Sequence, residues 1–331
     1  MILDTRFFFR VLVFPGFLFL FSFTLFCDWF ERKVMARMQN RMGPSYAGPF
    51  GILQPFADWV KLLTKEDIVP EGAGGLALAI APIISFSLLV LSMLYFPLDG
   101  ANAFSNEGFE GDLLLVLALV TFANFLLFLL GWSSSNPYSG IGAVRILTQF
   151  VGYDIPLTIL SLGPAFLAGS LSLSRIASAQ KVPFALAIPW AFAFFLLALQ
   201  AELEEDPFGT PHAETEIAAG YWTELTGRKL AFVRFSEDLQ VVFGAVLAAD
   251  LFLGGPYGPA FELGHGLPIV WFVLKALFII FMLEFVEAVC ARLRIDQVVR
   301  TNWKLMVPLS LLSLALVTFC IPFVQSATGG A

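Results

Sequence analysis

Charged residues are scarce in this sequence: Asp, Glu, Lys and Arg make up 14% of its 331 residues, whereas hydrophobic residues make up 58%. An average soluble domain has about 25% charged residues. The 19 basic and 26 acidic side chains are too few to cover a soluble protein of this size, which excludes an ordinary soluble enzyme and a disordered chain. The net charge of −7 and the lack of a basic tract argue against binding to nucleic acid.

Cysteine and histidine are rarer still, and their positions argue against several kinds of redox and metal site. Cys27, Cys290 and Cys320 lie far apart without a Cys-x-x-Cys pair, and the two histidines are His212 and His265. An iron–sulfur cluster usually needs four thiolates, and a zinc site needs a tight cluster of ligands. We therefore expect no iron–sulfur cluster, metal or disulfide framework in this chain, so that any redox centre lies in a partner.

Long apolar runs are abundant instead. A helix needs about 20 apolar residues to cross the hydrocarbon core of a bilayer, and the alternating pattern of an outer-membrane barrel is absent. We predict an all-α, polytopic membrane protein with about eight transmembrane helices, forming a single integral membrane domain over residues 1–331. No small-residue cleavage site follows the first run, so a cleaved signal is not expected. The eight segments are 8–29, 74–97, 112–131, 141–168, 182–200, 237–254, 268–289 and 303–324.

Lys and Arg residues are distributed unevenly between the loops. Fourteen of the 19 lie in alternate loops, four lie on the opposite side, and Lys275 lies inside the seventh segment. Because basic loops stay on the cytoplasmic side, we predict that the long loops 30–73 and 201–229 are cytoplasmic and that both termini lie outside. The expected location is the prokaryotic plasma membrane or an equivalent energy-transducing membrane.

The first long loop contains the stretch FGILQPFADWVKLLTKED, whose apolar and polar residues separate at helical spacing. This pattern predicts an amphipathic helix over residues 50–66 that lies at the membrane surface. A helix that packs on neighbouring helices fits the pattern equally well. The apolar face holds Ile52, Leu53, Phe56, Trp59, Val60 and Leu63, and the polar face holds Gln54, Asp58, Lys61 and Lys65.

The second long loop is acidic, with seven acids against only Arg228 and Lys229 in residues 201–229. Most acidic runs are solvated loops. Apolar residues such as Ile217, Tyr221 and Trp222 alternate with the acids here, and a solvated loop does not need them. We therefore predict that this loop is folded against a partner or a cavity.

Six ionisable residues lie within or at the ends of the apolar segments, where each charge costs a few kcal/mol to insert. Some of them could snorkel to an interface if the segment boundaries are displaced. The whole set also fits a polar path across part of the membrane, because burial and neighbouring cations can tune carboxylates for proton transfer. This signal indicates a transporter, pump or channel. The six are Arg145, Asp154, Asp250, Lys275, Glu284 and Glu287.

Four long motifs follow one another along the chain. They are ERKVMARMQNRMGPSYAGPFGILQPFADWVKLLTKE at 31–66, GWSSSNPYSGIGAVRILTQFVGYDIP at 131–156, DPFGTPHAETEIAAGYWTELTGRKLAF at 206–232 and RLRIDQVVRTNWKLMVPLSL at 292–311. Together they resemble the H subunit of NADH-quinone oxidoreductase, or complex I, which is the NADH dehydrogenase subunit 1 family. The resemblance covers nearly the whole chain.

The resemblance implies a heel subunit that joins the membrane arm to the soluble iron–sulfur subunits of a peripheral arm. Quinone, reduced by electrons from a partner's cluster, would be the substrate, and its reduction would be coupled to proton translocation. The family's cytoplasmic loops help to form the quinone chamber, which places the predicted surface helix beside the opening of an apolar chamber. The chain alone would hold no complete active site. The implied partners are other membrane-arm subunits, the iron–sulfur subunits, lipid and quinone.

The resemblance and the ionisable residues of the apolar segments together give the candidate site residues. We expect Arg37 or Arg41 to contact the partner arm or an internal carboxylate, and Asp154 to be paired, for instance with Arg145, or partly protonated. The quinone-chamber or partner-arm candidates are Arg32, Arg37, Arg41, Asp58, Lys61, Phe208 and Arg228. The proton-coupling candidates are Asp154, Glu214, Glu216, Glu224, Arg145, Glu284 and Glu287, with Asp154 standing where the family usually has Glu.

The acidic loop departs from the usual family pattern. Pro207-Phe208-Gly209 stands where the family has Pro-Phe-Asp, and His212 stands where it has Glu, so one acid is lost and another is a histidine. Homologous heel subunits also occur in membrane-bound hydrogenases and in ferredoxin- or deazaflavin-fed oxidoreductases, and the chain could act mainly as a structural adaptor. An independent secondary transporter would predict an internal repeat, and none is visible. The first-loop motif and Gly131-Trp132-Ser133-Ser134 favour the respiratory branch.

Overall fold

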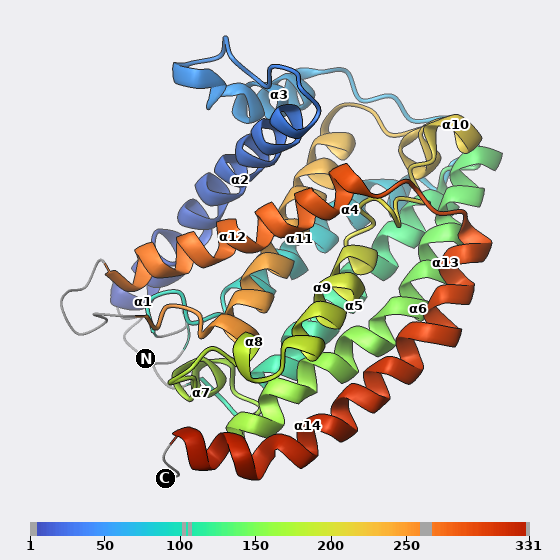
Figure 1. Ribbon diagram of the computed structural model, residues 1–331. Coiled ribbons are helices and arrows are strands. Elements are labelled where there is room, and N and C mark those ends of the chain that lie inside the picture. Colours follow the sequence, from blue (N-terminus) through green and yellow to red (C-terminus); the bar gives the residue numbers. More distant parts are fainter. Residues whose placement is uncertain (1–4, 101–103, 105–107, 259–266, 329–331) are drawn as a thin grey trace.

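The computed structural model describes residues 5–100, 104, 108–258 and 267–328 (Figure 1). All regular secondary structure in these ranges is helical, which confirms the predicted all-α fold. The long helices are α2 (Phe17–Met38), α4 (Gly75–Met93), α5 (Asp112–Ser133), α6 (Pro137–Ala168), α9 (Pro189–Glu202), α11 (Gly227–Leu253), α12 (Leu267–Val289) and α14 (Val307–Thr328). The shorter elements are α1 (Thr5–Leu12), η1 (Pro49–Gly51), α3 (Gln54–Thr64), α7 (Leu173–Ser178), α8 (Phe184–Ala187), α10 (Glu214–Ile217), η2 (Gly220–Trp222), α13 (Ile295–Thr301) and the π-helical turn η4 (Asn302–Met306).

Six helical stretches of the described chain are long and apolar enough to cross a membrane. The chain is therefore a polytopic membrane protein. Of the eight predicted segments, 182–200 and 237–254 are not among the six stretches found by length and composition in the described residues. The predicted segment 182–200 is divided into α8 and the 14-residue α9, which begins at Pro189. The predicted segment 237–254 lies within α11, which also carries several charged side chains. The six stretches are Phe9–Met38, Gly75–Met93, Asp112–Ser133, Pro137–Ala168, Leu267–Val289 and Ile295–Ile321.

Helix α11 lies in the middle of the bundle and packs against α4, α12 and the surface helix α3 (Figure 1). Residues 239–252 of this helix are all buried. A helix that is apolar on every side is stable only when it is enclosed, and this stretch is apolar apart from Gln240 and Asp250. On the other side of the bundle, α6 packs against α5, α9 and α14.

Helix α6 is longer than a membrane crossing requires. Its 32 residues span about 48 Å at 1.5 Å per residue, whereas the hydrocarbon core is about 30 Å thick. The helix begins at Pro137, after an Asn136 side chain that accepts a hydrogen bond from the Tyr138 amide at 2.9 Å. Proline at the first helical position and Asn at the cap are both favoured. The first turns of α6 thus reach the acidic loop.

The acidic loop is folded, as its apolar residues predict. Tyr221 is completely buried, and η2 packs against α5 and α6. Two glycines make this contact possible: a Cβ atom on Gly142 would lie 2.8 Å from the Tyr221 amide nitrogen, and one on Gly131 would lie 2.8 Å from the Tyr221 Cβ. The predicted surface helix is α3, which packs against α2 and α11. Both long loops lie at the same end of the bundle, at the top of Figure 1.

Candidate functional site

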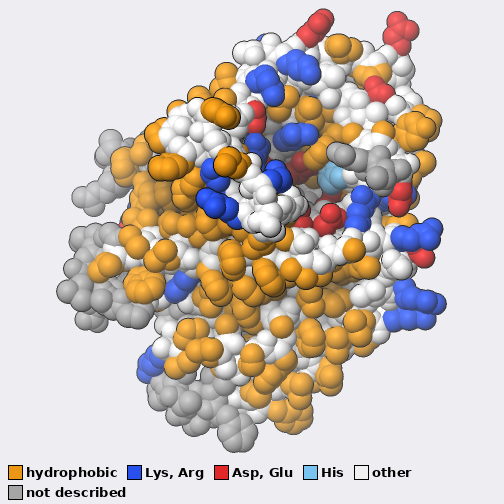
Figure 2. Space-filling model, turned by 45° about the horizontal axis from the view of Figure 1, so that its top comes forward, with side chains coloured by type: hydrophobic (Ala, Val, Ile, Leu, Met, Phe, Trp, Pro, Cys, Tyr) orange, Lys and Arg blue, Asp and Glu red, His pale blue; other side chains and the backbone are white. Residues whose placement is uncertain are grey.

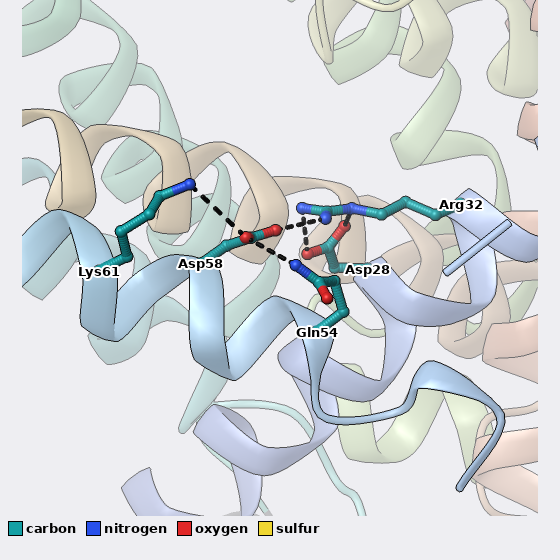
Figure 3. Close-up of polar contacts among 5 residues, drawn as sticks. All are labelled: Asp28, Arg32, Gln54, Asp58 and Lys61. Atoms are coloured by element: carbon teal, nitrogen blue, oxygen red, sulfur yellow. Dashed lines mark hydrogen bonds and ion pairs between the residues drawn. The ribbon is translucent and has the colours of Figure 1, made fainter. Parts of the chain in front are cut away.

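Arg32 joins α2 to the surface helix α3 through two carboxylates (Figure 3). Its Nε and Nη2 atoms donate to the two oxygens of Asp28 at 2.7 and 2.9 Å, and its Nη1 atom donates to Oδ2 of Asp58 at 2.8 Å. Gln54 donates to Oδ1 of Asp58 at 2.9 Å, and Nζ of Lys61 lies 3.8 Å from the same oxygen. Partial burial opposes ionisation of Asp58, but these neighbours outweigh burial and lower its pKa. Asp58 is thus held in its charged form.

A cavity of about 450 Å³, here called the surface-helix cavity, lies beside this cluster between α2, α3 and α11. Leu25, Trp59 and Phe235 form apolar parts of its wall. The volume is within the range of about 300–1,000 Å³ that is typical of small-molecule sites. The lining therefore suits a ligand that has both an apolar body and a polar group. The charged residues of the wall are Asp28, Arg32, Asp58, Lys61, Arg234, Glu237 and Asp238.

A second cavity of about 440 Å³, the acidic-loop cavity, lies between the acidic loop, α11 and the end of α12. Glu237 of α11 forms one wall, where it accepts hydrogen bonds from the Tyr221 hydroxyl and, at 2.9 Å, from Nε1 of Trp222. In the acidic loop, which forms another part of the lining, Nε2 of His212 lies 3.3 Å from Oε2 of Glu204. Glu237 and Trp222 also line the surface-helix cavity, so the two cavities share a wall.

A third cavity of about 360 Å³, the first-loop cavity, brings four glutamates together with Arg32 and Arg41. Burial raises the pKa of Glu205 well above its ordinary value, and the neighbouring carboxylates of Glu287 and Glu284 raise it further. Figure 2 shows acidic and basic side chains and a histidine around a hollow at this end of the molecule. Within the described residues, no group of three or more acidic, His or Cys side chains has the proximity that a metal ion needs. The four glutamates that line the first-loop cavity are Glu31, Glu205, Glu284 and Glu287.

A chain of buried polar side chains leads from the acidic-loop cavity into the bundle. Gln240, on the cavity wall, donates to Oδ1 of Asn124 at 2.9 Å, and Asn124 donates to Oε1 of Glu202 at 2.7 Å. The three residues are 5–6% exposed. Thr121, one turn before Asn124 on α5, donates to Asp154 at 3.3 Å, and residues three apart share a helix face. The face of α5 that contacts Glu202 through Asn124 therefore also contacts Asp154 through Thr121.

The structure pairs several of the predicted proton-coupling residues, but not as expected. Arg145 contacts Glu216 at 2.7 Å and donates to the Thr210 carbonyl at 3.2 Å. The suggested pairing of Arg145 with Asp154 is therefore wrong, because nine residues along a helix separate two side chains by about 13 Å. Glu224 accepts a hydrogen bond from the Asn136 side chain at the start of α6. These contacts hold the acidic loop on α6.

The other predicted residues are divided between the cavities and the surface. Arg32, Asp58 and Lys61 meet at the surface-helix cavity, as described. Arg37 is exposed on the wall of an apolar groove of about 470 Å³ between α2 and α12. Arg41 is exposed beside the first-loop cavity.

Two of the remaining candidates, Phe208 and Arg228, do not line these cavities. Phe208, 6% exposed, lies in the hydrophobic core, and Arg228 is exposed at the start of α11. The side chain of Glu214 lies outside the described residues.

Sequence reasoning misses several acidic members of the site. Asp28 and Glu31 fall at the polar end of the first apolar segment, and Glu237 and Asp238 begin the sixth segment, so neither pair stands out. Glu202 falls within the predicted acidic loop, although it ends α9 inside the bundle. Each of these acids lies at the end of an apolar segment, and this position is visible in the sequence. Whether such an acid belongs to a site depends on which segment ends lie close together in the fold, and the sequence does not show that.

The fold and the site define a helical membrane protein with a cluster of charged cavities at one end. The family model described as NADH dehydrogenase matches residues 11–318. The chain is 41% identical to the H subunit of NADH-quinone oxidoreductase from Dehalococcoides mccartyi, covering 88% of this chain and 80% of the relative. It is 40% identical to the protein of the same name from Thermomicrobium roseum, covering 88% and 89%, and 41% identical to that from Geobacillus kaustophilus, covering 86% of each. The chain therefore belongs to the NADH dehydrogenase family of membrane subunits.

Proposed function

We propose that this chain is the membrane subunit of a complex I-like NADH-quinone oxidoreductase that forms part of the quinone chamber and couples quinone reduction to proton translocation. The observation that carries the proposal is the continuity from the surface-helix cavity, through Glu237 on the shared wall, to the buried residues Gln240, Asn124 and Glu202. The names of the relatives support the respiratory branch over a hydrogenase anchor.

The surface-helix cavity would hold the quinone headgroup. Trp59 and Phe235 offer flat apolar surface, and Arg32 or Lys61 would attract the negative charge that develops on the reduced oxygens. The quinone takes up two electrons from an iron–sulfur centre of a partner and two protons, and becomes the quinol. This chain would supply the chamber wall, the charges and a route for protons, while the electron donor belongs to the partner.

The first loop would contact the soluble partner. Met42, Tyr46 and Phe50 are 92%, 101% and 80% exposed, and exposed large apolar side chains gathered on one segment mark an interaction surface. The same end carries the exposed Arg37 and Arg41. We infer that this end faces the cytoplasm and that both termini lie on the outer side, since the basic loops gather here.

Coupling would be electrostatic. At an effective dielectric constant of about 20, two unit charges about 8 Å apart interact by about 2 kcal/mol, which is about 1.5 pKa units. Charge created in the surface-helix cavity can therefore change the protonation of Glu237, which lines both cavities. The buried chain from Gln240 to Glu202 would pass that change towards Asp154. Glu216, paired with Arg145, would lie beside this route.

The test compares amide and carboxylate variants in the assembled complex. Glu202→Gln, Asp154→Asn and Glu216→Gln should lower the number of protons translocated per quinone at least threefold, because an amide cannot release a proton. Glu202→Asp, Asp154→Glu and Glu216→Asp should retain more than half of it.

The matched control is Glu110→Gln, an exposed residue paired with Arg175, which should behave like the parent. Amide variants that translocate protons like the parent, at equal assembly, would show that these acids are structural. A photoreactive quinone that labels this chain in the assembled complex only outside residues 25–62 and 222–238 would refute the chamber assignment.

A further inference from the structure

His212 occupies an unusual position in the acidic-loop cavity. Its ring lies against two aromatic side chains, with centroids 4.1 Å from Trp222 and 5.0 Å from Tyr221. Nε2 contacts Oε2 of Glu204 at 3.3 Å, whereas the buried Nδ1 atom has no hydrogen-bond partner. With Nε2–H donated to Glu204, Nδ1 carries the free lone pair of the neutral ring. One ring nitrogen is thus held in place by Glu204, and the other is a buried acceptor without a partner.

The groups that face this ring come from every element around it. The segment after α9 contributes Glu204, Glu205 and Asp206, and α12 contributes Glu287. Helix α11 contributes Glu237, together with Arg234, whose guanidinium lies 4.8 Å from the Trp222 ring centre. Arg292 and the Tyr221 hydroxyl complete the wall.

Carboxylates outnumber cations around the cavity, so the surroundings favour an imidazolium. Burial alone would lower the pKa of His212, but the hydrogen bond with Glu204 and the carboxylate of Glu237 outweigh burial and raise the pKa above its ordinary value. The ordinary pKa of histidine is about 6.5. Because the pKa is raised, the imidazolium persists to a higher pH than that of an ordinary histidine.

We propose that His212 is the proton-binding group of the acidic-loop cavity and takes up and releases one proton at Nδ1 in each coupling cycle. This inference rests on the proposed function, because it names a residue of the same proton path. On uptake, an N–H bond forms at Nδ1 and the ring becomes a cation held by Glu204. On release, that bond breaks, the proton passes to a carboxylate of the cavity such as Glu237, and the ring is neutral again.

The experiment measures protons translocated per quinone reduced, from pH 5.5 to 9, in proteoliposomes that contain the assembled complex. In the parent, this ratio should fall as pH rises, with a midpoint above 6.5. His212→Gln should lower the ratio at least threefold at pH 7 and abolish the midpoint, with quinone reduction within twofold of the parent. His212→Glu should restore at least half of the ratio and shift the midpoint. His265→Gln, the change at the other histidine, is the matched control and should keep the parent profile.

Each outcome decides the matter. A His212→Gln complex with the parent ratio and midpoint overturns the inference, as does a failure of His212→Glu to restore coupling. If the His212→Gln complex does not assemble, His212→Lys is measured instead. Lysine holds its proton at neutral pH, so quinone reduction in this variant should not be coupled to proton translocation. A His212→Lys complex that is coupled as well as His212→Glu overturns the inference. A parent complex that moves no protons during quinone reduction refutes the proposed function itself, whereas a coupled parent beside an unaffected His212→Gln complex refutes only the role of the histidine.

Discussion

Replacing Arg32 with Gln should loosen the contact between α2 and the surface helix α3. The guanidinium donates hydrogen bonds of 2.7 and 2.9 Å to Asp28 and of 2.8 Å to Asp58, and the Asp28 side chain is only 9% exposed. Breaking a buried ion pair costs about 3–5 kcal/mol, because one charge is left uncompensated. Since 39% of the Arg32 side chain is exposed, solvent screens the contact, and we expect a cost of about 2–3 kcal/mol.

A companion change, Asp28→Asn, identifies the cause of this cost. In the double variant the buried carboxylate is gone, so that only net hydrogen bonds are lost, at about 1 kcal/mol. The double variant should therefore cost about 1–2 kcal/mol less than Arg32→Gln alone, as expected for residues in contact. If the cost came from lost packing of the Arg32 stem, the second change would not reduce it.

Hydrogen–deuterium exchange of the assembled complex is the appropriate assay, because it reports local opening free energies. Amides in the peptide 54–64 should exchange about 30–150-fold faster in Arg32→Gln, since each 1.4 kcal/mol is a factor of ten. The control Arg175→Gln removes an ion pair whose side chains are 57% and 58% exposed and should leave this peptide unchanged. Exchange within threefold of the parent in Arg32→Gln, or a double variant as labile as the single one, would refute the reasoning.

Three further predictions concern the loops. Gly142→Ala places a Cβ atom 2.8 Å from the Tyr221 amide nitrogen and should destabilise η2 by about 1–3 kcal/mol; Gly140→Ala, where nothing lies within 4 Å, is its control, and exchange in 213–226 measures both. The pKa of His212 is raised in the folded state, so its contribution to stability is complete below about pH 6.5 and is lost as pH rises through the folded value. Hydrogen exchange in residues 203–226, corrected for intrinsic rates, should show this loss of stability in the parent. The loss should be smaller in His212→Gln. The pKa of Asp58 is lowered in the folded state, so its contribution to stability persists above about pH 3.8 and is lost only as pH falls through the folded value. If the amides of α3 already lose protection from hydrogen exchange between pH 7 and 5, this prediction is wrong.

Local sequence was sufficient for the helical fold and for the surface helix. Apolar runs such as 112–131 have one stable state in a bilayer, a helix, because every backbone polar group must find a partner within its own segment. The separation of Trp59 from Asp58 and Lys61 across 50–66 likewise predicted α3. Limits appeared where a segment was short or charged. Pro189 begins α9 and so separates it from α8 within one predicted span. Glu237 and Asp238 of α11 line cavities that its own sequence does not reveal.

The sequence alone therefore determined that this is an apolar helical protein with two unusual loops. Composition and periodicity are local properties, and an apolar segment in a membrane has to form a helix to satisfy its own backbone polar groups. Tertiary structure alone decided which charges meet. Arg145 reaches Glu216, 71 positions away along the chain, and not Asp154 on its own helix, and Asn124 joins Glu202 to Gln240 from three different helices. An ion pair depends on a few ångströms between side chains, and that spacing is set by how the helices cross, which no single segment encodes.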